Sequence, residues 1–432
     1  MPHDQTPRVA GRYTRPDMIA AMYGQVLLPG MVIVEHSFDL PLDHGDPSSE
    51  RVTVFARELA APDGRDRPFL LYLQGGPGFE AVRPTRSPDS PGWVNRALRE
   101  YRVLMLDQRG TGRSSPVGTL PDRTPEQQAE YLAHFRAESI VRDAESIRRE
   151  LGAERWSVLG QSFGGMCVVT YLSLAPDGLS EAFITGGLPP LGPRIDEVYA
   201  RTYQLALERN RRYYERYPAD RDRVLRLYER VDGGGVQLPS GDVLTWRRFR
   251  QLGQMLGMSD GAERLHYLLE LPPESPAFLH DVAEAVGFAR NPLYAVLQEA
   301  GWADGGVTRW SAERMLPAAF DAPHLFTGEH VFPWMFEDHG ALAPLREAAH
   351  LLAEREWSRL YDEEVLAANE VPTAAAIYAN DMYVERSFSE ETAGLIAGLR
   401  PWITNEYEHN GLRVDGERVL GRLIELARGP AS

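Results

Sequence analysis

The stretch WSVLGQSFGGM, residues 156–166, places a serine among three glycines directly after a short apolar run. An apolar run, a glycine-rich turn and a second apolar run predict a strand that turns sharply into a helix. Gly160, Ser162 and Gly164 fit the pattern G-x-S-x-G, in which such a turn lifts the serine hydroxyl out of the edge of a sheet. The stretch therefore predicts either a nucleophilic Ser162 or a glycine-rich turn that carries an inert serine.

Apolar runs on both sides of this stretch extend the pattern. PFLLYLQGGPG (68–78), YRVLMLDQRGTG (101–112) and EAFITGG (181–187) each combine a short apolar segment with glycines at its end. Strands that are apolar on both faces suit the interior of a parallel sheet covered by helices. Residues 124–152 and 165–176 supply helices between these strands, the first expected as one long helix. Strand and helix alternate, which predicts a doubly wound α/β sheet.

Turn and capping residues indicate where further elements begin. Residues 31–44 and 50–60 are β-branched and alternating, and the turn-forming GDPSS separates them, which predicts a hairpin. Thr124 has the properties of a helix N-cap, with Pro125 at the first helical position and Gln127 at the third. These signals place a hairpin before the sheet interior and a capped helix inside it.

The character of the chain changes after residue 193. Residues 194–369 are dominated by amphipathic helical segments in which arginines and acids interleave, as on a solvated helix face. Strand character returns at VPTAAAIYANDMYV (371–384), and an amphipathic helix follows near the end. We therefore expect an α/β core made of residues 1–193 and 370–432, with residues 194–369 inserted as a helical cap.

Composition excludes several classes of partner. The chain has 432 residues, 43% of them hydrophobic and 25% charged, which is ordinary for a globular protein with a large core. Its formal net charge of −16 argues against nucleic acid or an anionic membrane as a partner, since both attract clustered positive charge. We therefore expect neither as a partner.

Cysteine usage and hydropathy indicate the compartment. The single cysteine, Cys167, cannot form an intrachain disulfide and lies in an apolar run, where buried packing is expected. Residues 1–24 alternate charged and small residues and lack the apolar core of a secretory signal. No run of about 18 apolar residues occurs that could cross a membrane. These features predict a cytoplasmic protein.

A nucleophilic serine on such a sheet needs a base and an acid, in the chain order Ser, Asp or Glu, then His. Asp381 comes directly after the expected strand TAAAIYA, at the edge where sites form in open α/β sheets. His409 is the only histidine that follows it. We therefore predict a triad of Ser162, Asp381 and His409, with Asp415 and Glu408 as weaker candidates for the acid.

An oxyanion hole requires backbone N–H groups directed at the charge that develops on the substrate carbonyl. Phe163, the residue after the nucleophile, supplies one N–H group in this type of turn. The glycine-rich loop LQGGPGFE (73–80) supplies the other, and we select Gly76 as the donor, with Gly75 as the alternative. Neither GGPG nor RGTGRSS matches a phosphate-binding loop, because neither pattern contains the required lysine.

Six motifs together resemble the prolyl aminopeptidases, also called proline iminopeptidases, and in particular their longer bacterial branch. The motifs are GGPG (75–78), DQRGTGRS (107–114), GQSFGG (160–165), GEHVFPWMFE (328–337), YANDMYVE (378–385) and TNEYEHNGLR (404–413). The resemblance extends from about residue 30 to the end and is weakest in the cap. It implies an α/β-hydrolase fold with a helical cap and release of an N-terminal proline or other residue from short peptides.

The resemblance implies the same functional residues as the pattern argument. It gives Ser162 as nucleophile, Asp381 as acid, His409 as base, and Gly76 and Phe163 as oxyanion donors. Two departures are visible in the sequence. The glycine motif begins with Gln74 where the family usually has histidine, and YAND replaces the G-x-x-D pattern of the short branch around the acid.

Family members hold the substrate's free α-amino group with glutamates from the cap. The match to GEHVF suggests Glu329, and Glu337 is a looser candidate. A buried ammonium needs a nearby carboxylate, which agrees with this assignment. The same segment lacks H-E-x-x-H spacing, so we expect no metal and no organic cofactor.

Two other functions compete with a peptidase that acts on peptides with a free N-terminus. The first is an esterase or amidase with the same triad, which an entirely apolar pocket would favour. The second is a catalytically inactive binding protein, against which the complete set of Ser162, Asp381, His409 and the glycines argues.

Overall fold

The computed structural model describes residues 25–85 and 91–429. The segment in which we expected no secretory signal, residues 1–24, lies outside the described residues. No helix within the described ranges has the length and apolar content that a membrane span requires.

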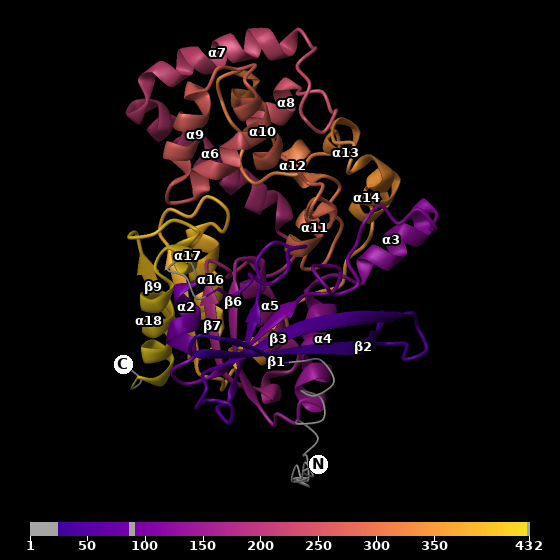
Figure 1. Ribbon diagram of the computed structural model, residues 1–432, viewed down its shortest axis with the longest axis vertical. Helices are drawn as coiled ribbons and strands as arrows, with labels where there is room; N and C mark the ends of the chain where they lie inside the picture. The colour runs from indigo at the N-terminus through magenta and orange to yellow at the C-terminus, as the bar shows by residue number, and fades with distance from the viewer. Residues whose placement is uncertain (1–24, 86–90, 430–432) are drawn as a thin grey trace, which may run out of the picture.

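A nine-stranded sheet forms the centre of the core (Figure 1). Its strands are β1 Gln25–Leu28, β2 Met31–Pro41, β3 Arg51–Ala60, β4 Phe69–Leu73, β5 Arg102–Asp107, β6 Trp156–Gln161, β7 Leu179–Thr185, β8 Thr373–Tyr378 and β9 Arg400–Thr404. They are ordered β1-β2-β3-β5-β4-β6-β7-β8-β9. The first three strands are antiparallel, β3 runs antiparallel to β5, and all later pairs are parallel. The expected hairpin and the mostly parallel sheet are thereby confirmed.

Helices cover both faces of the sheet. The core helices are α2 Gly92–Ala97, α3 Pro125–Ala133, α4 Ala137–Glu150, α5 Phe163–Leu174, η1 Pro176–Gly178, α16 Arg386–Leu395, α17 Gly411–Val414 and α18 Gly416–Arg428. Alternate residues of β4 show the two layers: Leu70 and Tyr72 pack with α2 and α18, whereas Leu71 and Leu73 pack with α4 and α5. The strands are apolar on both faces because both faces are buried. Cys167 of α5 is fully buried in this packing, as expected.

The segment 124–152 is two helices, and the expectation of one long helix is wrong. The predicted cap is present: Thr124 and Gln127 form a reciprocal capping box at the start of α3. The chain then leaves the helix between α3 and α4, where the guanidinium of Arg109 binds the carbonyl oxygen of His134 at 2.8 Å. Arg136 has an extended backbone and begins α4 while its side chain binds the carbonyl oxygen of Ala303 in the cap. Tertiary hydrogen bonds to the backbone therefore override the helical pattern.

Between β7 and β8 the chain forms a helical layer above the carboxyl ends of the strands (Figure 1). Its elements are α6 Ile195–Arg216, α7 Pro218–Asp232, α8 Trp246–Phe249, η2 Arg250–Gly257, α9 Gly261–Glu270, α10 Pro276–Ala285, α11 Pro292–Trp302, α12 Ser311–Arg314, η3 Ala318–Asp321, α13 Met335–Asp338, η4 Ala343–Leu345, α14 Arg346–Ala353 and α15 Glu363–Ala367. We call this layer the cap. Boundaries at 193/194 and 369/370 remain a prediction, since α14 packs on α3 and α15 on α5 of the core.

Two strands escaped the sequence analysis. β1 and β9 are the two edge strands of the sheet, and β9 carries Pro401 and alternating exposed residues. Edge strands accept proline and polar side chains because one side of the strand has no partner to pair with. β9 nevertheless matters for the site, since the chain leaves it directly toward His409.

Candidate active site

Ser162 occupies the turn between β6 and α5. Its backbone has φ 56° and ψ −123°, a left-handed conformation that is strained for a serine. The strain is maintained by packing on both sides, because β6 lies in the middle of the sheet and α5 is buried from Phe163 to Ser173. The turn directs the residue away from both elements, as a nucleophilic serine requires.

The glycines beside Ser162 leave space for backbone. A Cβ atom on Gly160 would lie 2.2 Å from the carbonyl oxygen of Gly164, and one on Gly164 would lie 2.0 Å from the carbonyl oxygen of Leu73. Neither position therefore accepts a side chain while the strands and the helix keep their places. Close backbone contacts therefore require both glycines of the G-x-S-x-G pattern in this chain.

Asp381 lies three residues beyond the end of β8 and is 2% exposed. Its Oδ1 atom accepts hydrogen bonds from the backbone N–H groups of Tyr383 (2.9 Å) and Val384 (3.1 Å). Backbone donors stabilise the charged form of a carboxylate and fix its orientation. The other oxygen, Oδ2, is left to face His409.

His409 connects the acid to the serine. Its Nδ1 atom lies 2.7 Å from Oδ2 of Asp381, and its Nε2 atom lies 2.9 Å from Oγ of Ser162. Burial lowers the pKa of the imidazole, but the charge and hydrogen bond of Asp381, together with the charge of Glu329, raise the pKa above its ordinary value. The structure thus brings together three residues that are more than 200 positions apart at the extremes, in the hydrogen-bonded order that a general base and its orienting acid need.

The two alternative acids are engaged elsewhere. Asp415 accepts a hydrogen bond from the hydroxyl of Tyr407 at 2.7 Å. Glu408 forms an ion pair with Arg209 of α6. Neither carboxylate contacts the imidazole of His409, so Asp381 is the acid that the geometry favours.

Gly76 and Phe163 both line a narrow cavity that opens at Ser162. The N–H group of Phe163 is the first of α5 and has no acceptor within the helix. Gly75 packs directly against Ser162, since a Cβ there would lie 3.0 Å from Cβ of Ser162. Gln108 stabilises the glycine-rich loop 73–80, because its side-chain amide donates a hydrogen bond to the carbonyl oxygen of Gln74 at 2.9 Å. Both expected donors are therefore adjacent to the serine.

Glu329 lies in the same cavity, on the cap side. Its Oε1 atom accepts a hydrogen bond from the hydroxyl of Tyr294 in α11 at 2.9 Å. Burial raises the pKa of this carboxyl to about 7, although the positive charge of His409 and the Tyr294 hydroxyl act in the opposite direction. A carboxyl group that is costly to ionise alone is well suited to bind a cation.

Glu337 is not part of this cavity, and its selection as a site residue is corrected here. The side chain is 57% exposed and lies 3.6 Å from Arg247, on the outside of α13. Only a short segment separates it from Glu329, but α13 turns it toward solvent. Its carboxylate has no contact with Ser162.

The sequence analysis missed Gln298, which lines the cavity beside Glu329. The side chain is 3% exposed, and its Oε1 atom has no hydrogen-bond partner among the described residues. Gln298 and Tyr294 are four residues apart and so share one face of α11. That spacing was present in the sequence, but nothing there indicated which face of α11 meets the core.

The cap also contacts the residues around His409. Tyr383 packs edge-on against the imidazole, with ring centroids 4.7 Å apart. The backbone N–H group of His409 donates to the carbonyl oxygen of Gly257 in η2 at 3.3 Å. The base is therefore enclosed by the cap as well as by the sheet.

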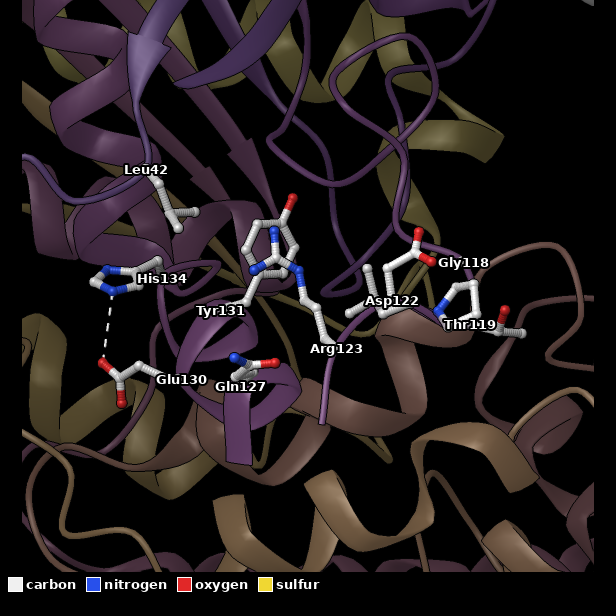
Figure 2. Close-up of a pocket in the computed structure, with 11 residues that line it drawn as sticks. Leu42, Gly118, Thr119, Asp122, Arg123, Gln127, Glu130, Tyr131 and His134 are labelled. Atoms are coloured by element: carbon white, nitrogen blue, oxygen red, sulfur yellow. Dashed lines mark ion pairs between the residues drawn. The ribbon is translucent and has the colours of Figure 1, made fainter. Parts of the chain in front are cut away.

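A separate hollow lies at the surface beside α3 (Figure 2). Arg123 stacks over the ring of Tyr131 there, at 4.2 Å from its centroid, and His134 lies close to Glu130. This hollow shares no residue with the cavity at Ser162. Among the described residues, no three histidine, cysteine or acidic side chains converge as metal ligands would.

The sheet order, the strained serine turn and the Ser–His–Asp hydrogen bonds define the class: this is a hydrolase of the α/β-hydrolase fold. The family model described as "alpha/beta hydrolase fold" matches residues 68–412. A proline iminopeptidase of Aeromonas sobria is 49% identical over 93% of this chain and 98% of its own. Proline iminopeptidase aneH of Aspergillus aculeatus is 36% identical over 91% of this chain and 93% of its own. The chain belongs to the proline iminopeptidase family.

Proposed function

We propose that this protein is a serine aminopeptidase that releases an N-terminal residue, preferably proline, from short peptides with a free N-terminus. The observation that carries the proposal is the continuous hydrogen-bonded series from Asp381 through His409 to Ser162, with distances of 2.7 and 2.9 Å. The names of the two relatives support the preference for proline.

Catalysis begins when Oγ of Ser162 attacks the first peptide carbonyl and His409 Nε2 takes the hydroxyl proton. Asp381 holds the imidazole in the required tautomer and stabilises its charged form. The N–H groups of Phe163 and Gly76 bind the oxyanion of the tetrahedral intermediate. As the C–N bond breaks, His409 returns the proton to the leaving amine. Water activated by His409 then hydrolyses the aminoacyl ester and restores Ser162.

Glu329 makes the reaction specific for a free N-terminus. Its carboxylate pairs with the substrate's α-ammonium group inside the cavity, where an acetylated amine would bring no charge and need more room. The cavity is about 10 Å³ as the structure stands, the space of a single water molecule. Binding of a prolyl residue therefore requires this cavity, whose wall includes Gln298 and Trp302 of α11, to widen.

An esterase or amidase with the same triad is the second candidate. Phe163, Met166, Trp302 and Val384 give the cavity a mainly apolar wall, which would also suit an acyl chain. The buried carboxyl of Glu329 favours the peptidase, because an acyl chain offers it no partner. A role limited to binding does not account for the strained turn at Ser162. The single buried cysteine supports a reducing, cytoplasmic location.

The test is hydrolysis of prolyl-, alanyl- and leucyl-naphthylamides, each free and N-acetylated, by wild type and Ser162→Ala. We expect cleavage of the free prolyl compound, none of its acetylated form, and a loss of at least about 10³-fold in the variant. Equal rates on free and acetylated compounds would reject the aminopeptidase and leave a general acyl hydrolase. Unchanged activity in Ser162→Ala would reject the nucleophile itself.

A further inference from the structure

A second cavity, of about 580 Å³, is lined in part by His409 and shares no lining residue with the cavity that holds Glu329. We call it the leaving-group cavity. Gln74, Gln161 and His409 line its inner end, Met258 of the cap contributes to its wall, and Arg83 and Arg413 add charge. It is large enough for one or two amino-acid residues. No step of the mechanism above uses it.

The two cavities share no lining residue, and each reaches the triad at a different member: Ser162 lines the first and His409 the second. Gly76 lines the Glu329 cavity, Gln74 lines the leaving-group cavity, and Gly75 between them packs on Ser162. The acyl part of the substrate belongs on the Glu329 side, where the ammonium is bound. The leaving amine must lie beside His409, because His409 gives it a proton. The peptide that leaves therefore extends into the second cavity.

The charges of the leaving-group cavity are mostly engaged with one another or with neighbours. Arg83 binds the buried Asp107 with both terminal nitrogens. Glu417 pairs with Arg99, and Asp415 accepts the hydroxyl of Tyr407. Arg83 and Glu417 are therefore each paired with a group of opposite charge, and Asp415 is hydrogen-bonded by a neutral hydroxyl.

Arg413 is different. It lies in α17, four residues after His409, and its side chain is exposed. Within residues 25–85 and 91–429 it forms no ion pair and no side-chain hydrogen bond with another protein group. Arg413 and His409 line the same cavity, and the positive charge of Arg413 opposes the rise in the pKa of His409, as expected for two groups within electrostatic range. A free guanidinium in a cavity lined by two glutamines is suited to bind an anion.

Resting on the proposed aminopeptidase function, we propose that Arg413 binds a carboxylate of the leaving peptide and so selects short peptides whose second residue carries one. A guanidinium matches a carboxylate through two parallel N–H···O bonds. In a dipeptide the carboxylate is the C-terminus, and in a longer peptide it is the side chain of Asp or Glu at the second position. Arg413 is a specificity-determining residue in this account, with no part in proton transfer.

The experiment compares kcat/KM for Pro-Ala with Pro-Ala-amide, and for Pro-Glu-amide with Pro-Gln-amide, by mass-spectrometric detection of free proline. We expect wild type to prefer the carboxylate member of at least one pair by about five- to tenfold. The first pair reports a C-terminal source and the second a side-chain source. The preference should weaken as salt is raised toward 0.5 M, because the guanidinium is exposed.

Arg413→Gln should bring the ratio to about one, and Arg413→Glu should invert it toward the amides. The matched control is Arg226→Gln, an exposed arginine of α7 at the far end of the cap (Figure 1), which should keep the wild-type ratio. A wild-type ratio near one in both pairs would overturn the proposal, as would a ratio that survives in Arg413→Gln. Hydrolysis of prolyl-naphthylamide, which has no carboxylate, tests the aminopeptidase function independently of Arg413. If wild type does not cleave this compound, the proposed function fails, whatever the ratios for the peptide pairs.

Discussion

Oγ of Ser162 lies 2.9 Å from Nε2 of His409, yet the two residues are positioned by different parts of the molecule. Ser162 belongs to the centre of the sheet, where backbone packs on backbone at Gly160 and Gly164 and no side chain fits. His409 lies in a loop that follows the edge strand β9. An edge strand has a neighbouring strand on one side only, so the sheet gives this loop less support than it gives the turn at Ser162. The cap supplies the missing support.

Besides the hydrogen bond from His409 to Gly257, side chains join the cap to the loops that carry the acid and the base. Arg209 of α6 binds both the carboxylate of Glu408 and the carbonyl oxygen of Asn380, the residues directly before His409 and Asp381. Ser259 donates its backbone N–H (3.0 Å) and its hydroxyl (2.8 Å) to Oδ1 of Asn410. The hydroxyl of Tyr383 donates to the carbonyl oxygen of Gln254 in η2.

The comparison teaches that the nucleophile is fixed by the core, whereas the base and the acid are positioned jointly by core and cap. The cap contributes to the wall of the cavity that must widen for a prolyl residue, and the same cap orients His409. A movement of the cap on substrate binding therefore also acts on the position of His409. Substitutions on the two sides should differ in what they damage, and the predictions below separate them.

The largest effect is expected where the two sides meet, at Asp381. Asp381→Asn keeps the size of the side chain but removes the charge that sets the tautomer of His409, and we expect kcat to fall by about 10⁴-fold. Thermal unfolding measured alongside should change little. A fall of less than tenfold would show that another group orients His409.

Two glycine substitutions test the comparison directly. In Gly164→Ala the new Cβ meets the backbone of Leu73, which cannot move without β4, so we expect a loss of about 3 kcal/mol in the free energy of unfolding. In Gly257→Ala the new Cβ would lie 2.3 Å from Cζ of Tyr383. We expect the Tyr383 ring to shift and to displace the imidazole of His409 that packs on it. The free energy of unfolding should then change less than in Gly164→Ala, whereas kcat should fall by up to about 100-fold.

Unfolding midpoints and kcat, measured on both glycine variants, check this contrast. Equal loss of stability in the two variants, with no separate loss of kcat in Gly257→Ala, would contradict a base positioned by the cap.

Arg209 should have a smaller effect. Arg209→Met removes the link from α6 to the loops before Asp381 and His409, and we expect kcat for prolyl-naphthylamide to fall about tenfold with little change in KM. Arg209→Lys, which keeps the charge and part of the reach, should recover some of the loss. A rise in KM alone, or no difference between Met and Lys, would indicate that Arg209 does not act through the triad.

The smallest effect concerns pH. Neutral His409 is the active base, so kcat/KM falls as pH is lowered through the raised pKa of His409. The negative charge of Glu329 contributes to that rise. Glu329→Gln removes it, and the acid limb should move to lower pH by less than about one unit. The profile is measured with 4-nitrophenyl acetate, which has no ammonium for Glu329 to bind; a shift to higher pH would contradict the assignment.

The parts of the site that could be predicted from sequence are those with local or topological causes. Ser162 lies in a motif whose glycines are required by backbone contact. Asp381 and His409 follow from chain order, since only one histidine comes after the acid. Glu329 was selected through a family motif, with Glu337 as a looser candidate, and the motif could not show that α13 turns Glu337 toward solvent, because the orientation of α13 depends on tertiary packing.

The cap residues could not be predicted in the same way. Gln298 and Arg209 lie in amphipathic or charged segments, and such patterns do not reveal which face meets the core; the same holds for Arg413 in α17 of the core. The break between α3 and α4 likewise depends on Arg109, a residue from a distant turn that takes the carbonyl of His134. The sheet interior is encoded locally by apolar runs, whereas the contacts of the cap are encoded by pairs of residues far apart in sequence.

The most direct measurement of the central claim is intact-mass and peptide-mapping analysis after reaction with a fluorophosphonate, on wild type, Ser162→Ala and His409→Ala. We predict one adduct on wild type, located at Ser162, none on Ser162→Ala, and labelling slowed by at least about 10²-fold on His409→Ala. An adduct on a different residue, or equal labelling rates in wild type and His409→Ala, would contradict a serine activated by the base that core and cap position together.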